Sequence, residues 1–459
     1  MILAIGSLAF YAYADQYMIF FLLSSIMCNY LLACLIQHAK WRKAFLTISI
    51  VMNVGLLLFL KYTNFLITNF NLLLKTKYVS PELPLPLGIS FITFQQIVYL
   101  ITVYQEGCSE SIGGGVEKIG LLDYLVYILY FPKLLMGPLV EPVDFITQLN
   151  DPAAKRISGN HIAQGLKIFS LGLFKKVVLA DTFAVAFAWG CENMNTLTSL
   201  DCFLIMISYT FEIYFDFSGY SDMAVGASRM LNITLPMNFD SPYKALSIRD
   251  FWKRWHISLT KFFTKYLYIP LGGSRKGKAF TCLNMMIVFI ISGIWHGAGW
   301  AFILWGMLHG TLCILDRIFE RMEDKVIKPI RWFVTFFYVN ILWLLFGLNS
   351  INNWIAMLKN MFTFRSMCLS TELRDIFFIP EMGVLCDALH YIFHLNLYGI
   401  SWLWVAVFVM TALGICLLAE NNYRRMTKLL TGNMIFAAIA LAWGILYLST
   451  NTVFVYSEF

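Results

Sequence analysis

The chain has 459 residues, of which 59% are hydrophobic and only 13% are charged, and its mean hydropathy is +0.69. Soluble globular proteins carry about twice this charge, so the composition indicates a membrane protein. The net charge of +7 does not indicate nucleic acid as a partner, because the basic excess sits in short segments between apolar stretches. That distribution is typical of cytoplasmic loops and reports topology.

Apolar stretches of about 17 to 25 residues recur along the chain, each long enough to cross a hydrocarbon core about 30 Å thick. Backbone polar groups must be paired inside the bilayer, and no run of short alternating strands occurs. We therefore predict an all-α polytopic membrane protein with about 10 to 11 hydrophobic segments, some of them re-entrant or interfacial. They lie near 17–36, 44–62, 85–104, 119–136, 165–190, 196–215, 280–295, 299–316, 331–348, 400–419 and 432–450.

The first residues, "MILAIGSLAFYAYAD", end in an Ala-Tyr-Ala that resembles a signal-peptidase site. They lack the basic region that begins a signal peptide, so we predict a helix there. No internal repeat or long linker marks a further domain, and we expect one integral-membrane domain over 1–459.

The distribution of Lys and Arg predicts the topology. The basic clusters, which we place in the cytoplasm, are 38–43, 249–278, 317–331 and 424–428. Two stretches poor in Lys and Arg, which we place outside, are 191–200 and 349–401. Counting spans from the first basic cluster to the second gives the wrong parity, so one segment between 85 and 136 is predicted to enter without crossing. Two stretches are too polar to span: an amphipathic cytoplasmic segment at about 218–278 and an extracytoplasmic loop at about 349–399.

Aromatic and basic residues alternate at helical spacing in "SIRDFWKRWHISLTKFFTKYLYIPLGG". This pattern is typical of amphipathic helices at the membrane surface, and a plain surface anchor is one explanation. His256 argues against it, because it lies beside Trp255 within the apolar pattern, where an anchor has no use for an imidazole.

Several known catalytic and binding motifs are absent. "GGSRKGKA" resembles a P-loop, but Ala279 stands where Ser or Thr is needed. No nucleophile elbow, zinc-protease motif or HxxxxD pattern occurs, and the ten cysteines show no paired spacing. Asp387, His390 and His394 are too loosely spaced to predict a metal site, so we expect no metal.

Ionisable residues within or beside apolar segments are costly and are therefore functional candidates. They are Glu141, Glu212, Asp216, His256, His296 and His309. His296 is followed by Gly-Ala-Gly and flanked by Trp295 and Trp300, which suit the walls of a narrow apolar slot. A neutral histidine there is suited to take a proton from an alcohol that attacks an activated acyl group. A structural histidine is the alternative.

The second histidine of this stretch, His309, follows His296 by thirteen residues. On a continuous helix this separation corresponds to about 20 Å of rise and a rotation of about 220°. The two rings therefore meet only if Gly297 and Gly299 break the helix. A helix-end histidine bonded to a carbonyl is the alternative for His309.

Successive blocks of the sequence resemble the membrane-bound O-acyltransferase family, in particular its branch of bacterial alginate O-acetyltransferases. These blocks are "LPLGISFITFQQIVYLITVY", "YFPKLLMGPLVEP", "GLFKKVVLAD", "FDFSGYSDMAVGASRM", "LPMNFDSPY", "FWKRWHISLTKFFTKYLYIPLGG" and "WHGAGWAFILWGMLHG". The core blocks cover about 84–320, and after residue 320 the resemblance is only hydropathic. Members usually begin with one more hydrophobic segment ahead of the "LAFYAY" block.

The resemblance implies a helical shell around a central tunnel, with His296 as the catalytic residue and His256 as a second site residue approached from the cytoplasm. We expect the substrates to contact further residues of these blocks, namely Trp295, Trp255, Asp216, Asn238, Arg254 and His309. The implied reaction passes an acyl group, acetyl above all, to hydroxyls of an exported polysaccharide or to a partner protein. No cofactor is expected to be bound permanently, and the donor is expected to be acetyl-CoA or another acyl thioester.

The implied location is the cytoplasmic membrane of a bacterium. The implied partners are the lipid bilayer, an extracytoplasmic acetylesterase-like or acetyltransferase-like protein and polysaccharide synthase machinery. Two alternatives stay open. One is the D-alanyl transferase of teichoic acid, from the same family. The other is a non-catalytic transporter of acyl groups or glycan, which is expected to show inverted repeats that we do not find.

Overall fold

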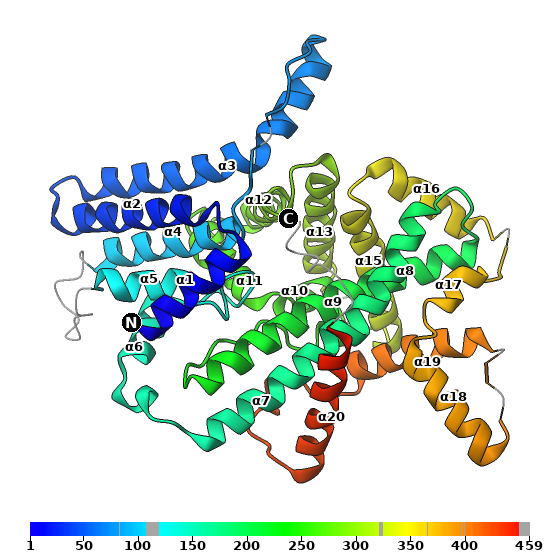
Figure 1. Cartoon of the computed structure of the whole chain (residues 1–459). Helices are drawn as coiled ribbons and strands as arrows, with labels where there is room; N and C mark the ends of the chain where they lie inside the picture. The colour runs from blue at the N-terminus through cyan, green and yellow to red at the C-terminus, as the bar shows by residue number, and fades with distance from the viewer. Residues whose placement is uncertain are drawn as a thin grey trace. The chain divides into compact units, whose positions relative to one another are not determined.

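The computed structural model describes residues 1–81, 83–106, 119–320, 325–364, 366–395, 397–398 and 400–448 (Figure 1). All the regular secondary structure in these ranges is helical, which confirms the predicted all-α fold. The described residues form two compact units. The single-domain organisation stays a prediction.

The first unit comprises Met1–Phe169 and Met223–Met237. Its helices are α1 (Ile2–Ala14), α2 (Ile19–His38), α3 (Arg42–Leu74), α4 (Ile89–Glu106), α5 (Leu121–Leu129), α6 (Pro142–Asn150) and the first part of α7 (Gly159–Phe174). The helix predicted at the N-terminus is α1. Helices α2, α3 and α4 lie side by side (Figure 1). Between α2 and α3, the buried amides of Asn29 and Asn53 hydrogen-bond at 2.6 Å, a polar link of the kind that joins apolar membrane helices.

The segment predicted near 119–136 does not form one long helix. Helix α5 ends at Leu129 after nine residues and is followed by turns over 131–136. Nine residues rise only about 13 Å, less than half of a hydrocarbon core about 30 Å thick. Helix α5 therefore fits the predicted segment that enters without crossing.

The second unit comprises Ser170–Asp222 and the described residues from Asn238 onward. Its helices begin with a π-helical turn (Lys175–Ala180), α8 (Asp181–Glu192) and most of α9 (Ser199–Met230). They continue with α10 (Ile248–Arg254), α11 (Ile257–Phe263), α12 (Lys278–His296), α13 (Trp300–Ile318) and α15 (Lys328–Leu348). The last are α16 (Ile351–Phe362), α17 (Thr371–Asp375), α18 (Pro380–Phe393), α19 (Ser401–Leu417) and α20 (Thr431–Tyr447). The segment predicted as a loop over 349–399 thus contains three helices.

Five helices in the described part of the chain are long and apolar enough to span a membrane: α2, α3, α12, α13 and α15. The apolar helices α1, α19 and α20 are shorter. The segments predicted near 85–104, 165–190 and 196–215 also form helices, although their composition is more polar.

Glycines explain how α12 and α13 pack against each other in the second unit (Figure 1). A Cβ atom on Gly293 would overlap the carbonyl oxygen of Phe302, and one on Gly306 would overlap that of Phe289. Glycine lets two membrane helices approach backbone to backbone, and the glycine-rich "SGIWHGAGWAFILWGMLHG" stretch supplies it from both helices. The result is a tight hairpin that turns directly after His296.

Candidate active site

His256 occupies a sharp break between α10 and α11. Its backbone is left-handed, with φ 43° and ψ 54°, a conformation that costs a non-glycine residue about 1 to 3 kcal/mol. Asn238 holds this conformation, because its backbone carbonyl accepts a hydrogen bond from Ile257 N–H at 2.9 Å. The Asn238 side-chain oxygen also accepts from the N–H and hydroxyl of Ser258, at 3.2 and 2.9 Å. Strain held in this way is frequent at functional sites.

The same contacts define the tautomer of His256. The Ser258 N–H can only donate, so the Asn238 atom that it contacts is the oxygen. Nδ1 of His256 lies 3.1 Å from that oxygen and must therefore carry a proton. In a neutral ring this leaves the lone pair on Nε2. Burial lowers the pKa of the His256 imidazole to about 3, so the ring is neutral at physiological pH.

His296 is the last residue of α12 and is buried among aromatic rings. The ring centroids of Trp295, Trp305 and Phe346 lie 4.7, 5.3 and 5.2 Å from that of the imidazole, all edge to face. The expected wall residue Trp300 is 59% exposed, and Trp305 and Phe346 instead pack on the His296 ring. Trp300 begins the next helix and faces outward.

One cavity of about 330 Å³ joins the two histidines. Its buried lining includes His256 and His296 together with Trp255, Leu259, Phe263 and Cys313. Its lining also includes the partly exposed Arg249 and the exposed Lys253 and Thr264. The lining therefore divides into a buried aromatic part, which includes both imidazoles, and a more exposed part, here called the exposed end, which includes the two cations Arg249 and Lys253. A larger cavity, of about 780 Å³, lies in the first unit and is lined by no histidine among the described residues.

The break at Gly297–Gly299 brings His309 back toward His296, which meets the condition set by the helical spacing. Trp305 contacts both imidazoles, with ring centroids 5.3 Å from His296 and 4.8 Å from His309. His309 is fully buried and does not line the cavity. Its Nδ1 accepts a hydrogen bond of 3.3 Å from the Trp252 indole N–H, and Trp252 does line the cavity.

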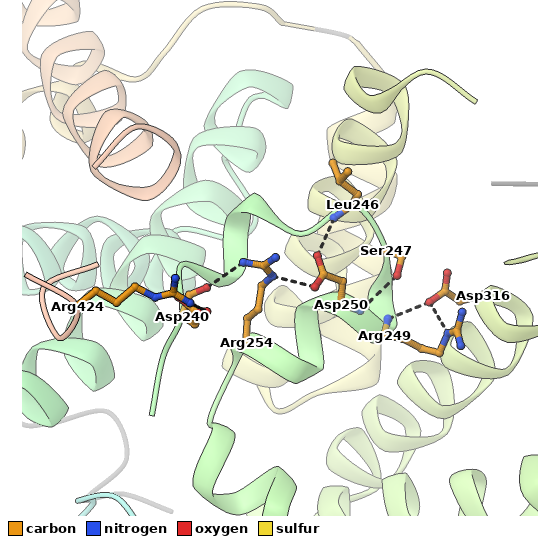
Figure 2. Close-up of polar contacts among 8 residues, drawn as sticks. All are labelled: Asp240, Leu246, Ser247, Arg249, Asp250, Arg254, Asp316 and Arg424. Atoms are coloured by element: carbon orange, nitrogen blue, oxygen red, sulfur yellow. Dashed lines mark hydrogen bonds and ion pairs between the residues drawn. The ribbon is translucent and has the colours of Figure 1, made fainter. Parts of the chain in front are cut away.

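Polar contacts at both ends fix helix α10, which carries Trp252 and leads into His256 (Figure 2). At its start, the backbone N–H and the Nε of Arg249 both donate to one oxygen of Asp316, each at 3.0 Å. At its end, Arg254 donates to Asp250 at 2.8 Å and to the Asp240 carbonyl at 3.4 Å. Arg424 pairs with the Asp240 side chain. These contacts hold the two sides of the histidine turn in place.

Of the residues expected to contact substrates, only Trp255 lines the cavity beside the two histidines. Trp295 packs on His296, Asn238 holds His256 and Arg254 belongs to the α10 contacts. Asp216 is buried on α9, where it pairs with Lys176 at 2.8 Å, and Lys176 also pairs with Asp181 at 2.7 Å. Substrate contact by these residues stays a prediction.

The remaining ionisable candidates lie elsewhere. Glu212 is buried on α9, and Glu141 precedes α6 in the first unit. Asp387 accepts a hydrogen bond from the Tyr398 hydroxyl at 2.7 Å.

Sequence reasoning missed Arg249, Trp305 and Phe346. A usable signal existed for Arg249, because Arg249 and Lys253 are four residues apart and so share one face of a helix. Phe346 gave no signal, because a phenylalanine in an apolar helix is ordinary.

The model of the membrane-bound O-acyltransferase family matches residues 8–355. The chain belongs to this family. It is 35% identical to the peptidoglycan O-acetyltransferase of Helicobacter pylori, over 100% of this chain and 91% of that protein. It is 36% identical to a probable alginate O-acetylase of Azotobacter vinelandii, over 71% of this chain and 64% of that protein. The teichoic acid D-alanyltransferase of Bacillus subtilis is 26% identical over 61% of this chain and 66% of its own length.

These matches confirm a multi-pass membrane O-acyltransferase whose relatives are bacterial. They correct one expectation, because the resemblance does not fade to hydropathy after residue 320. The family model extends to residue 355, and the Helicobacter relative aligns with the whole chain. Helix α15 supplies Phe346 to the His296 environment, so this later part of the chain also contributes to the site.

Proposed function

We propose that this O-acyltransferase passes an acetyl group from a cytoplasmic acyl thioester to a hydroxyl of an exported polysaccharide or of a partner protein. The observation that carries the proposal is the single cavity lined by both His256 and His296. Two buried imidazoles beside one space of about 330 Å³ are suited to hold one small acyl group and to move one proton.

The proposed reaction is direct. His296 takes the proton of the acceptor hydroxyl as its oxygen attacks the thioester carbonyl carbon. The new C–O bond forms, the C–S bond breaks and the proton passes from the imidazolium to the leaving thiolate. His256, whose lone pair is on Nε2, is placed to accept a hydrogen bond in the same cavity. A general base typically contributes about 10² to 10⁴ in rate.

The positions of the basic residues in the cavity lining support entry of the acyl donor from the cytoplasm. The exposed end carries Arg249 and Lys253, within the basic segment that we place in the cytoplasm. A cysteine-accessibility scan is expected to label 249–278 and 317–331 from the cytoplasm and 349–399 from outside. Labelling 349–399 and 249–278 from the same side would contradict this topology.

The relatives support acetyl over D-alanyl. The two relatives named for O-acetylation are 35% and 36% identical to this chain, against 26% for the D-alanyltransferase. The acceptor is proposed to be a surface glycan of the kind that those two names specify. An extracytoplasmic partner that receives the acetyl group first is the second form of the same proposal.

The deciding experiment compares the surface polysaccharide and peptidoglycan of cells with and without this protein, by mass spectrometry of their esters. Acetyl esters that depend on the protein and on His296 are expected. D-alanyl esters instead would favour the teichoic acid reaction. Unchanged esters in cells without the protein would contradict the proposed function. If the protein were a transporter, the His296→Ala protein would still support esterification.

A further inference from the structure

The exposed end of the cavity contains two cations with very different partners. Arg249 and Lys253 are four residues apart on α10 and both line the cavity. Arg249 is held on one edge by Asp316, whose side chain is only 8% exposed. Lys253 forms no ion pair with the residues that the structure describes.

The other edge of the Arg249 guanidinium has a weaker partner. Its Nη2 pairs at 3.2 Å with Glu320, whose side chain is 65% exposed. Exposed ion pairs contribute little and exchange readily, whereas the buried Asp316 keeps the guanidinium in position. Glu320 is therefore the more exposed partner of a guanidinium that Asp316 holds in position.

Charge and shape together favour one class of ligand. The buried part of the cavity lining is aromatic and leaves space for a small acyl group, whereas the exposed end offers an oriented guanidinium and the flexible ammonium of Lys253. Guanidinium groups bind phosphate oxygens through two donors at once, and a flexible lysine adds a point charge. A thioester that carries a phosphate at the end remote from its acyl group matches both ends.

We propose that Arg249 exchanges Glu320 for the phosphate of the acyl donor, that Lys253 completes this phosphate site, and that Glu320 sets the donor affinity as an internal competitor. This inference rests on the proposed function, because it assigns the residues that bind the charged part of the same acyl donor. It predicts that the chain distinguishes phosphorylated from unphosphorylated thioesters.

The test uses purified full-length protein and two probes, acetyl-phosphopantetheine and acetyl-pantetheine, which differ only in the phosphate. Binding is measured by thermophoresis at low and high salt. We expect tighter binding of the phosphorylated probe, with an advantage that shrinks as salt screens the exposed charges. Equal binding of the two probes would overturn this inference alone. Binding of neither would overturn it as well, and would also count against the thioester donor of the proposed function.

Three substitutions separate the site from general charge effects. Glu320→Gln should tighten binding of the phosphorylated probe by about two- to fivefold, the size of an exposed ion pair, and leave the other probe unchanged. Lys253→Gln should weaken binding of the phosphorylated probe only. Lys261→Gln is the matched control, because this exposed lysine of α11 does not line the cavity and its loss changes the net charge equally.

Two results with these variants would overturn the proposal. If Lys261→Gln weakens binding as much as Lys253→Gln, the effect is general attraction and no phosphate site exists. If Glu320→Gln weakens binding of the phosphorylated probe, Glu320 is no competitor. None of the three substitutions removes a buried partner, so folding is expected to be preserved.

Discussion

The two histidines of the cavity lie in different surroundings. His256 sits in a strained, left-handed turn fixed by hydrogen bonds that Asn238 accepts and by the polar contacts of α10. His296 ends an apolar helix and is packed by aromatic rings in a hairpin that glycines close. The contacts with Asn238 select one tautomer and one orientation of the His256 ring. The aromatic rings around His296 exclude water and confine its imidazole. The first arrangement suits a group that orients a substrate, and the second suits a group that gains and loses a proton.

The largest expected effect follows from removing the proton-accepting ring. His296→Ala should lower ester formation by about 10² to 10⁴ while the protein still inserts, folds and retains the acyl donor. Ester formation is measured on the extracted glycan by mass spectrometry, and folding by thermal melting of the purified protein. Normal esterification by a well-folded His296→Ala protein would show that the ring is structural and that the catalytic assignment is wrong.

The hairpin that carries His296 can be tested separately from its chemistry. Gly293→Ala places a Cβ against the Phe302 carbonyl, and overpacking of this kind costs about 1 to 3 kcal/mol. The expected result is a lower melting temperature together with lower activity. Gly414→Ala is the matched control, because a Cβ at that helical position of α19 has no neighbour within 4 Å. Equal melting temperatures for the two variants would mean that close packing of α12 and α13 does not stabilise the site.

The sequence predicted the parts of this site that depend on local patterns. Hydropathy located the helices, and Gly297 and Gly299 were the place where a break, if it occurred, would bring His309 toward His296. The contacts that hold His256 could not be predicted, because Asn238 lies eighteen residues before it and no local pattern predicts a left-handed histidine. The hydrogen bonds at the start of α10 join Arg249 to Asp316, which follows it by 67 residues, and only the folded chain brings the two together. Contacts between distant residues are set by packing, which hydropathy and helical periodicity do not encode.

His256 should matter less than His296, because it orients rather than takes the proton. His256→Gln is expected to lower acyl transfer by at least about tenfold, or about 1.4 kcal/mol. His256→Asn is the control for backbone strain, since asparagine tolerates the left-handed conformation better. Recovery in His256→Asn would assign the loss to strain, and near-normal turnover in both variants would return His256 to a structural role.

The pH dependence of folding gives an independent test of His256. Its folded pKa of about 3 lies below the ordinary value of 6.5, so the unfolded chain binds more protons between these two values. Stability from this group is therefore complete above about pH 6.5 and is lost as the pH falls toward 3. His256→Gln should make the melting temperature less sensitive to acid in this window.

The smallest expected effect on turnover concerns Trp252, which lines the cavity, and its hydrogen-bond partner His309. Trp252→Phe keeps the ring but leaves Nδ1 of the buried His309 without its donor, and a buried group that loses its partner costs about 1 to 3 kcal/mol. His309→Phe likewise leaves the Trp252 indole N–H without its acceptor. Either single variant should lower the melting temperature and raise KM more than it lowers kcat, because Trp252 lines the cavity but takes no proton.

The double variant Trp252→Phe/His309→Phe replaces both partners by apolar rings. It should recover part of the lost stability, since neither the indole N–H nor the imidazole then remains without its partner. Additive losses in the double variant would mean that the two residues act independently and that His309 does not position the wall through Trp252.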